Sequence, residues 1–144
     1  MTEFGDWLSY ATEAEADAYF SSSPNRRDWF AEDAEDRRAA LAEATRHVDT
    51  YRFAGAKSDP YQDLEFPRNG ETEVPVRVKA AVCEQALYLL TNPDWEQRLN
   101  AHAQGVTSQS TGGSVESYGA RAELLSAKAL RLLRPYLLRG GKLV

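Results

Sequence analysis

The sequence predicts a mainly α fold, a small helical bundle around one buried central helix at about residues 75–91. That stretch is apolar on nearly every face, and other stretches before and after it place apolar residues on one side at helical spacing. The composition, 42% hydrophobic and 27% charged, is that of an ordinary globular protein. At 144 residues the chain is expected to form a single domain, 1–144, with a C-terminal extension at 135–144.

The central helix is predicted from residues 74–90, which read VPVRVKAAVCEQALYLL. A helix that is apolar almost all round is buried by neighbours on several sides. This one is too short and too charged to span a membrane. Pro75 is expected at the first helical position, where its missing N–H costs nothing. Cys83 is expected to be a small buried hydrophobe, and as a lone cysteine it cannot form an internal disulfide. Apart from Lys79, the polar side chains form one narrow stripe: Arg77, Glu84, Gln85 and Tyr88.

Two helices are predicted before the central one. Thr12 and Glu15 fit a capping box, which opens a helix from Glu13 to about Ser21. A longer helix is expected from about Asp33 to Tyr51, with its apolar residues three, four and seven positions apart. Acidic residues crowd its first turns, where the helix dipole favours them, so they do not require a metal site.

Two helices are predicted after the central one. Asn92 and Pro93 begin a short helix that reaches Ala103. The last helix is expected from about Ala120 to Arg134, because Pro135 cannot donate a backbone hydrogen bond to the preceding turn.

Two segments are predicted to be non-helical. Residues 52–73 contain two prolines and two glycines and are predicted to be a long ordered loop, anchored by Phe53, Tyr61, Leu64 and Phe66. Residues 105–119 alternate in polarity around Gly112-Gly113 and are predicted to be a polar β-hairpin. It has few apolar side chains to bury, so it is either a mobile loop or is held by another chain.

The charge is distributed unevenly along the chain. The net charge is −5, yet residues 121–144 carry six basic and one acidic side chain. A basic end on an acidic body indicates that the two ends face different partners, although a solvated helix face with a charged tail fits equally well.

No catalytic constellation is present in the sequence. His47 and His102 lie on different predicted helices without a second ligand nearby, and no metal, nucleotide or nucleophile motif occurs. The chain is therefore predicted to be a binding or assembly protein without enzymatic activity and without a cofactor. The N-terminus lacks the basic and apolar regions of a signal peptide, so the chain is expected in a reducing cytoplasm or in a particle assembled there.

Nucleic-acid binding is the alternative function that the basic end suggests. Its arginines and lysines could contact phosphates, and a single-stranded-DNA-binding replication accessory protein is the second hypothesis. Single-strand binders also present aromatic platforms beside such charge, and here only Tyr136 is near it. A net acidic chain also repels DNA at a distance, so tight or sequence-specific binding is disfavoured.

Short motifs follow one another in a fixed order along nearly the whole chain. They are Thr12-x-Ala14-Glu15-Ala16-Asp17-Ala18-Tyr19-Phe20, Asp49-x-Tyr51, Phe66-Pro67-Arg68-x-Gly70, Val74-Pro75-x-x-Val78-Lys79-x-Ala81, the 106–118 hairpin and Leu133-x-Pro135-Tyr136. In this order they resemble a family of tailed-bacteriophage head–tail connector, or adaptor, proteins. Sequences of this kind are also grouped as DnaT-like single-stranded-DNA-binding proteins.

The resemblance implies a structural virion protein in the neck of the particle. It would form a homo-oligomeric ring of about twelve subunits that docks on the portal protein and receives a tail-side stopper or tail-completion protein. Genomic DNA would pass through the channel without specific binding, and no membrane would be involved.

The resemblance also implies where the contacts lie. The C-terminal segment would contact the portal through Arg131, Arg134, Tyr136, Leu137, Leu138, Arg139, Lys142, Leu143 and Val144. The hairpin would contact the neighbouring subunit through Val106, Ser108, Ser110, Val115, Ser117 and Tyr118.

Overall fold

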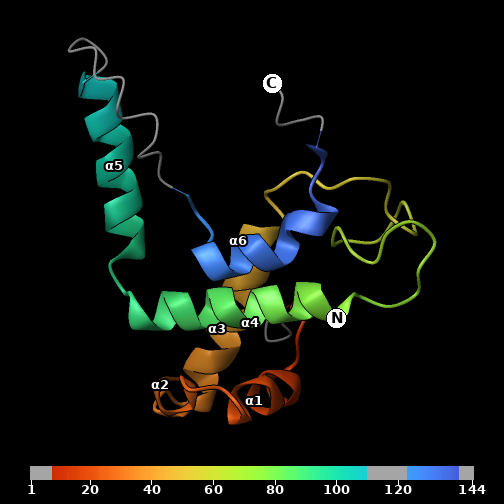
Figure 1. Cartoon of the computed structure of the whole chain (residues 1–144), viewed down its shortest axis with the longest axis horizontal. Helices are drawn as coiled ribbons and strands as arrows, with labels where there is room; N and C mark the ends of the chain where they lie inside the picture. The colour runs from red at the N-terminus through yellow and green to blue at the C-terminus, as the bar shows by residue number, and fades with distance from the viewer. Residues whose placement is uncertain (1–7, 110–122, 140–144) are drawn as a thin grey trace. The chain divides into compact units, whose positions relative to one another are not determined.

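The computed structural model describes residues 8–109 and 123–139, and only the backbone of residues 105–109. As predicted, the fold is mainly α (Figure 1). It divides into two compact units, one formed by residues up to 91 together with those from 125 onward, the other by residues 92–124. That 1–144 folds as a single domain stays a prediction. No helix among the described residues is long and apolar enough to cross a membrane.

Helix α4, Val76–Thr91, is the core of the first unit, which confirms the predicted central helix. Helices α3 (Ala34–Val48) and α6 (Ala127–Leu133) pack against it more extensively than any other elements do. In Figure 1, α3 crosses α4 and α6 lies along it. Pro75 lies just before the first helical residue rather than at it, and its carbonyl oxygen accepts hydrogen bonds from the N–H groups of Val78 and Lys79.

Part of the polar stripe of α4 is also buried. Gln85 is fully buried, and its side chain connects three helices. Its amide nitrogen lies 3.2 Å from Nδ1 of His47 on α3, and its amide oxygen accepts a hydrogen bond of 2.8 Å from the backbone N–H of Ser126, which caps α6. His47 Nε2 lies 2.9 Å from the Glu43 carboxylate. Because a buried polar group must find a partner, this network fixes how α3 and α6 sit on α4.

Two short helices precede α3 and pack against each other. Helix α1, Glu13–Ser21, begins with the predicted capping box between Thr12 and Glu15. A short helix that was not predicted, α2 at Arg26–Phe30, follows it. Trp29 of α2 is fully buried and stacks on Phe20 at a centroid distance of 4.6 Å.

The boundaries of two of these helices differ from the predictions. Helix α3 ends at Val48 rather than Tyr51. Helix α6 begins at Ala127 rather than Ala120, because the Ser126 hydroxyl accepts from the N–H of Ala129 and starts the helix there. Pro135 then lies in a short 3₁₀ helix, η3 at Arg134–Tyr136, that ends α6.

The predicted hairpin is wrong over its first residues. Helix α5, Trp95–Gln109, runs past Ala103, so residues 105–109 are helical and not a strand. A polar strand has little to pack against, whereas a continuing helix satisfies its backbone groups internally. Residues 110–119 lie outside the described residues. The second unit therefore contains α5, where Arg98 pairs with Asp94 at 3.2 Å and none of residues 92–104 is buried.

We predict that Val82→Asp abolishes stable folding. Val82 is fully buried in α4, and an unpaired carboxylate there costs several kcal/mol, comparable with the whole stability of a small domain. Thermal denaturation followed by circular dichroism measures the loss, with Val76→Asp as the matched control because Val76 is 81% exposed. Equal melting temperatures for the two variants would contradict the assignment of α4 as the core.

Candidate functional site

The loop at residues 52–73 is organised by one arginine. Arg68 is buried, and its guanidinium donates to the carbonyl oxygens of four residues over distances of 2.7 to 3.3 Å. It also donates to the Glu65 carboxylate at 2.7 Å. A guanidinium offers five donors in a fixed fork, so it satisfies carbonyl groups that the loop, lacking helix and strand, would leave unpaired. The four carbonyls belong to Phe53, Ala54, Gly55 and Glu65.

A second network ties the loop to α3. The Tyr10 hydroxyl donates to Asp49 at 2.6 Å and accepts from the N–H of Phe66 at 3.0 Å. The other oxygen of Asp49 accepts from the N–H of Glu65 at 3.2 Å. Burial raises the pKa of the Asp49 carboxyl and also that of the Tyr10 phenol. The loop therefore meets the end of α3 and the segment before α1 at one buried point.

The tip of the loop carries the most exposed large hydrophobic side chain of the described residues. Tyr61 is 90% exposed, so its predicted role as an anchor is wrong. The tip itself is held by Gln62, whose amide donates to the carbonyl oxygens of Leu64 and Pro67 at 2.8 and 3.0 Å. Asp59 accepts from the N–H of Tyr61 at 2.9 Å. Tyr61 thus projects from backbone that is fixed on both sides.

The other predicted anchors behave differently from Tyr61. Phe53 and Phe66 are buried, as predicted, with ring centroids 4.8 Å apart. Leu64 is only half-buried. The loop is therefore anchored by its two ends and by Arg68, and not by its tip.

The C-terminal arm, which we define as residues 134–139, pairs with the start of the loop. The N–H of Ala54 donates to the Tyr136 carbonyl at 2.9 Å, and the N–H of Leu138 donates to the Arg52 carbonyl at 3.0 Å. These bonds form an antiparallel bridge between Phe53 and Leu137. Two of the predicted partner contacts, Tyr136 and Leu137, are therefore engaged within the chain, and Tyr136 packs edge-on against Phe66 at 5.8 Å.

The remaining predicted contacts of this end are exposed. Leu138 is 39% exposed, and Arg131, Arg134 and Arg139 are also exposed. Within the part of the chain that the structure describes, none of these three arginines forms an ion pair. Arg77 joins them, because its guanidinium donates to the carbonyl oxygens of Leu132 and Arg131 at 3.2 and 3.3 Å. The end of α6 is therefore a basic surface.

The remaining candidates lie in α5 or outside the described residues. Val106 and Ser108 lie in α5, and their side chains are not described. The others lie outside the described residues: Ser110, Val115, Ser117, Tyr118, Lys142, Leu143 and Val144.

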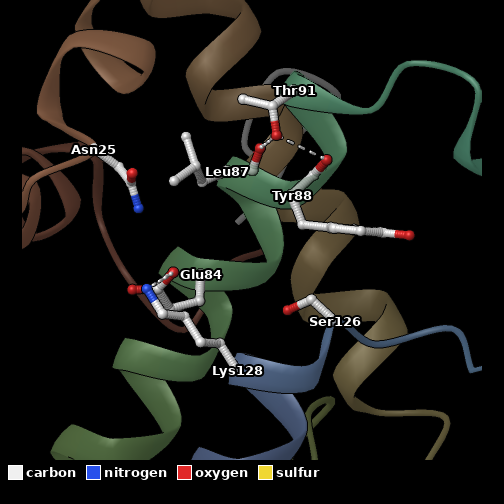
Figure 2. Close-up of a pocket in the computed structure, with 7 residues that line it drawn as sticks. All are labelled: Asn25, Glu84, Leu87, Tyr88, Thr91, Ser126 and Lys128. Carbon is white, nitrogen blue, oxygen red and sulfur yellow. Dashed lines mark hydrogen bonds and ion pairs between the residues drawn. The ribbon is translucent and has the colours of Figure 1, made fainter.

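A pocket that the sequence did not indicate lies beside the second half of α4 (Figure 2). Its volume is about 250 Å³. The buried Glu84 carboxylate accepts from the Tyr19 hydroxyl at 2.6 Å and lies 3.7 Å from the Lys128 ammonium. Burial together with this carboxylate raises the pKa of Tyr19. The residues that line the pocket are Asn25, Glu84, Leu87, Tyr88, Thr91, Ser126 and Lys128.

The imidazole of His47 and the thiol of Cys83 are both buried in the interior of the first unit. His47 belongs to the buried network with Gln85. Cys83 is buried, which raises the pKa of its thiol to about 12 and leaves it un-ionised at neutral pH. Among the described residues, no group of three or more His, Cys, Asp or Glu side chains could hold a metal ion.

We predict that Arg68→Ala destabilises the loop by about 3 kcal/mol, because several buried carbonyl oxygens lose their donor together. Chemical denaturation measures the free energy of unfolding, and hydrogen exchange of residues 54–58 reports the loop directly. Arg52→Ala is the matched control, since the Arg52 side chain is exposed. A change as small as that of the control would mean that Arg68 does not organise the loop.

Comparisons with known proteins give one family. No curated protein and no solved structure matches the chain. A family described as "Putative DnaT-like ssDNA binding protein" matches residues 5–143, which is nearly the whole chain. The chain therefore belongs to this DnaT-like family.

Proposed function

We propose that the chain is the subunit of a head–tail connector in a tailed bacteriophage. In this proposal about twelve copies form a ring that docks on the portal and joins the capsid to the tail. The order of the sequence motifs supports the proposal. The observation that carries it is the C-terminal arm, whose backbone is fixed on the loop while Leu138 and Arg139 remain exposed.

The arm has the properties of a preformed docking element. Its two backbone hydrogen bonds with Arg52 and Ala54 hold it against the loop, and Leu137, directly after η3, is extended. Successive side chains of an extended segment point to opposite sides, so Leu137, paired with Phe53, and Leu138 face different surroundings. A segment that is ordered before it binds loses less conformational entropy on binding, which favours affinity. In the connector, the arm would lead the end of the chain onto the portal.

The charge of the body suits a channel for DNA. The net charge is −5, and the basic side chains concentrate near the C-terminal end. An acidic wall repels phosphates, so DNA would slide past it without adhering. The protein would then lie in the neck of the virion, with the portal on one face of the ring and a tail-side stopper or tail-completion protein on the other.

We predict that the protein binds the portal of its own virus as a stoichiometric ring, measured by native mass spectrometry of the mixture. Leu138→Glu with Arg139→Glu should weaken binding at least about tenfold, since the arm loses its apolar and its basic contact. Arg27→Glu is the control, because Arg27 is exposed on α2, a different element. A wild-type protein that ignores the portal at all concentrations would overturn the proposal.

A single-stranded-DNA-binding replication accessory is the second candidate. Two observations favour it: the description of the family, and the group of exposed arginines at the end of α6. However, among the described residues 123–139 the only aromatic side chain is that of Tyr136, and it is partly buried. Tyr136 packs on Phe66, and the exposed Tyr61 lies between Asp59 and Asp63. Without a stacking platform, binding would depend on phosphate contacts alone.

If the second candidate is correct, oligo(dT) binding followed by fluorescence anisotropy should be micromolar or tighter and should weaken steeply with salt. Replacing Arg131, Arg134 and Arg139 by Ala should abolish it. The control replaces Arg26 and Arg27, which are exposed on α2. Absence of binding even at low salt would remove this candidate.

A further inference from the structure

We propose that Tyr61 of one copy inserts into the α4 pocket of the next copy and so makes the subunit contact of the ring. The inference rests on the proposed connector function and names its interface. It joins two features of the first unit that the structure otherwise leaves without a role, the exposed tyrosine of the loop and the pocket beside Glu84.

Tyr61 has the properties of a contact residue. It is 90% exposed, although a large aromatic side chain gains most from burial. The backbone around it is held by Gln62, Asp59 and Arg68, so the ring is presented from a fixed position. A tyrosine on ordered backbone loses little entropy on binding and supplies a large contact area. The loop therefore displays a protruding side chain that suits a small recess.

The pocket has the size and lining to receive such a side chain. Its volume of about 250 Å³ is below the range of roughly 300–1,000 Å³ for drug-sized ligands. Leu87 gives it an apolar surface, and the sticks in Figure 2 show Asn25, Glu84 and Lys128 around it. The recess thus fits one aromatic ring with a polar tip better than it fits a helix.

The charges around the two features are complementary. Tyr61 is flanked by the exposed carboxylates of Asp59 and Asp63. Lys128, at the pocket, is 65% exposed, and its distance of 3.7 Å from Glu84 is long for an ion pair. When Tyr61 enters the pocket, its acidic neighbours would approach this ammonium group. Such contacts orient partners and speed their encounter.

The two features lie toward opposite ends of α4. The loop leads into the first residue of α4, Val76, whereas the pocket is formed by residues from Glu84 to Thr91. Figure 1 shows the loop beyond one end of this helix, which is roughly 24 Å long at 1.5 Å per residue. A contact between two different surfaces at separate ends of a subunit is heterologous. Repeated from copy to copy, such a contact closes into a ring when the rotation between copies divides a full turn, as the proposed connector requires.

The experiment uses two variants that each remove one side of the contact. Tyr61→Ala removes the inserted side chain, and Thr91→Arg places a long side chain in the pocket from an exposed position, so it blocks entry sterically. Analytical ultracentrifugation of the full chain, alone and with the portal, should show each variant associating about 30-fold more weakly than wild type, as for a hot-spot residue. Tyr61→Phe, which keeps the ring, and Val76→Ala, which removes another exposed apolar group, should change association less than about threefold.

Mixing the two variants gives the sharpest result. Tyr61→Ala keeps an intact pocket and Thr91→Arg keeps an intact Tyr61, so one junction per pair remains possible. The mixture should form a one-to-one heterodimer and no larger species. Wild-type association that Tyr61→Ala leaves unchanged, a wild-type protein that stays monomeric both alone and with the portal, or a mixture without heterodimer would each overturn the contact.

The outcomes separate this inference from the proposed function. Rings of Tyr61→Ala on the portal would overturn the contact and leave the connector function standing. Self-association that depends on Tyr61, in a protein that does not bind the portal, would support the contact and overturn the connector function.

Discussion

The burial of α4 is the constraint on which the rest of the structure depends. Its apolar residues alone would let α3 and α6 slide along it, because hydrophobic burial has no direction. Gln85 removes this freedom, since its amide must face His47 on one side and the start of α6 on the other. The same helix places Glu84 at the pocket and leads back to the loop. One buried helix therefore positions the features that we assign to binding.

The loop before α4 shows a second use of buried polar groups. Its 22 positions contain no helix and only isolated bridges, so their carbonyl groups need other donors. Arg68 supplies donors to four of them from a single side chain, and Tyr10 and Asp49 join the loop to α3. The C-terminal arm then pairs with the start of this loop. The order of the arm thus depends on the order of the loop, which in turn depends on Arg68.

Local patterns in the sequence predict the helices well and the site poorly. The apolar run of α4, the capping box of α1 and the stripe of α3 depend on neighbours a few residues away, and all three are confirmed. The role of Arg68 and the exposure of Tyr61 depend on contacts far along the chain, so periodicity could not reveal them. The pocket joins residues of α4 to Asn25 and Lys128, which only the fold brings together. The alternating polarity after Gly105 suggested a strand, but α5 continues to Gln109.

The proposed connector subunit therefore has two kinds of contact. In this proposal the C-terminal arm would meet the portal, and the loop and pocket would join neighbouring copies, while the acidic body would leave DNA free to pass. Electron cryomicroscopy of the protein bound to its portal tests this most directly. We expect a closed ring in which the loop of each subunit contacts the second half of α4 of the next. Isolated subunits distributed along single-stranded DNA, with no ring on the portal, would contradict the account.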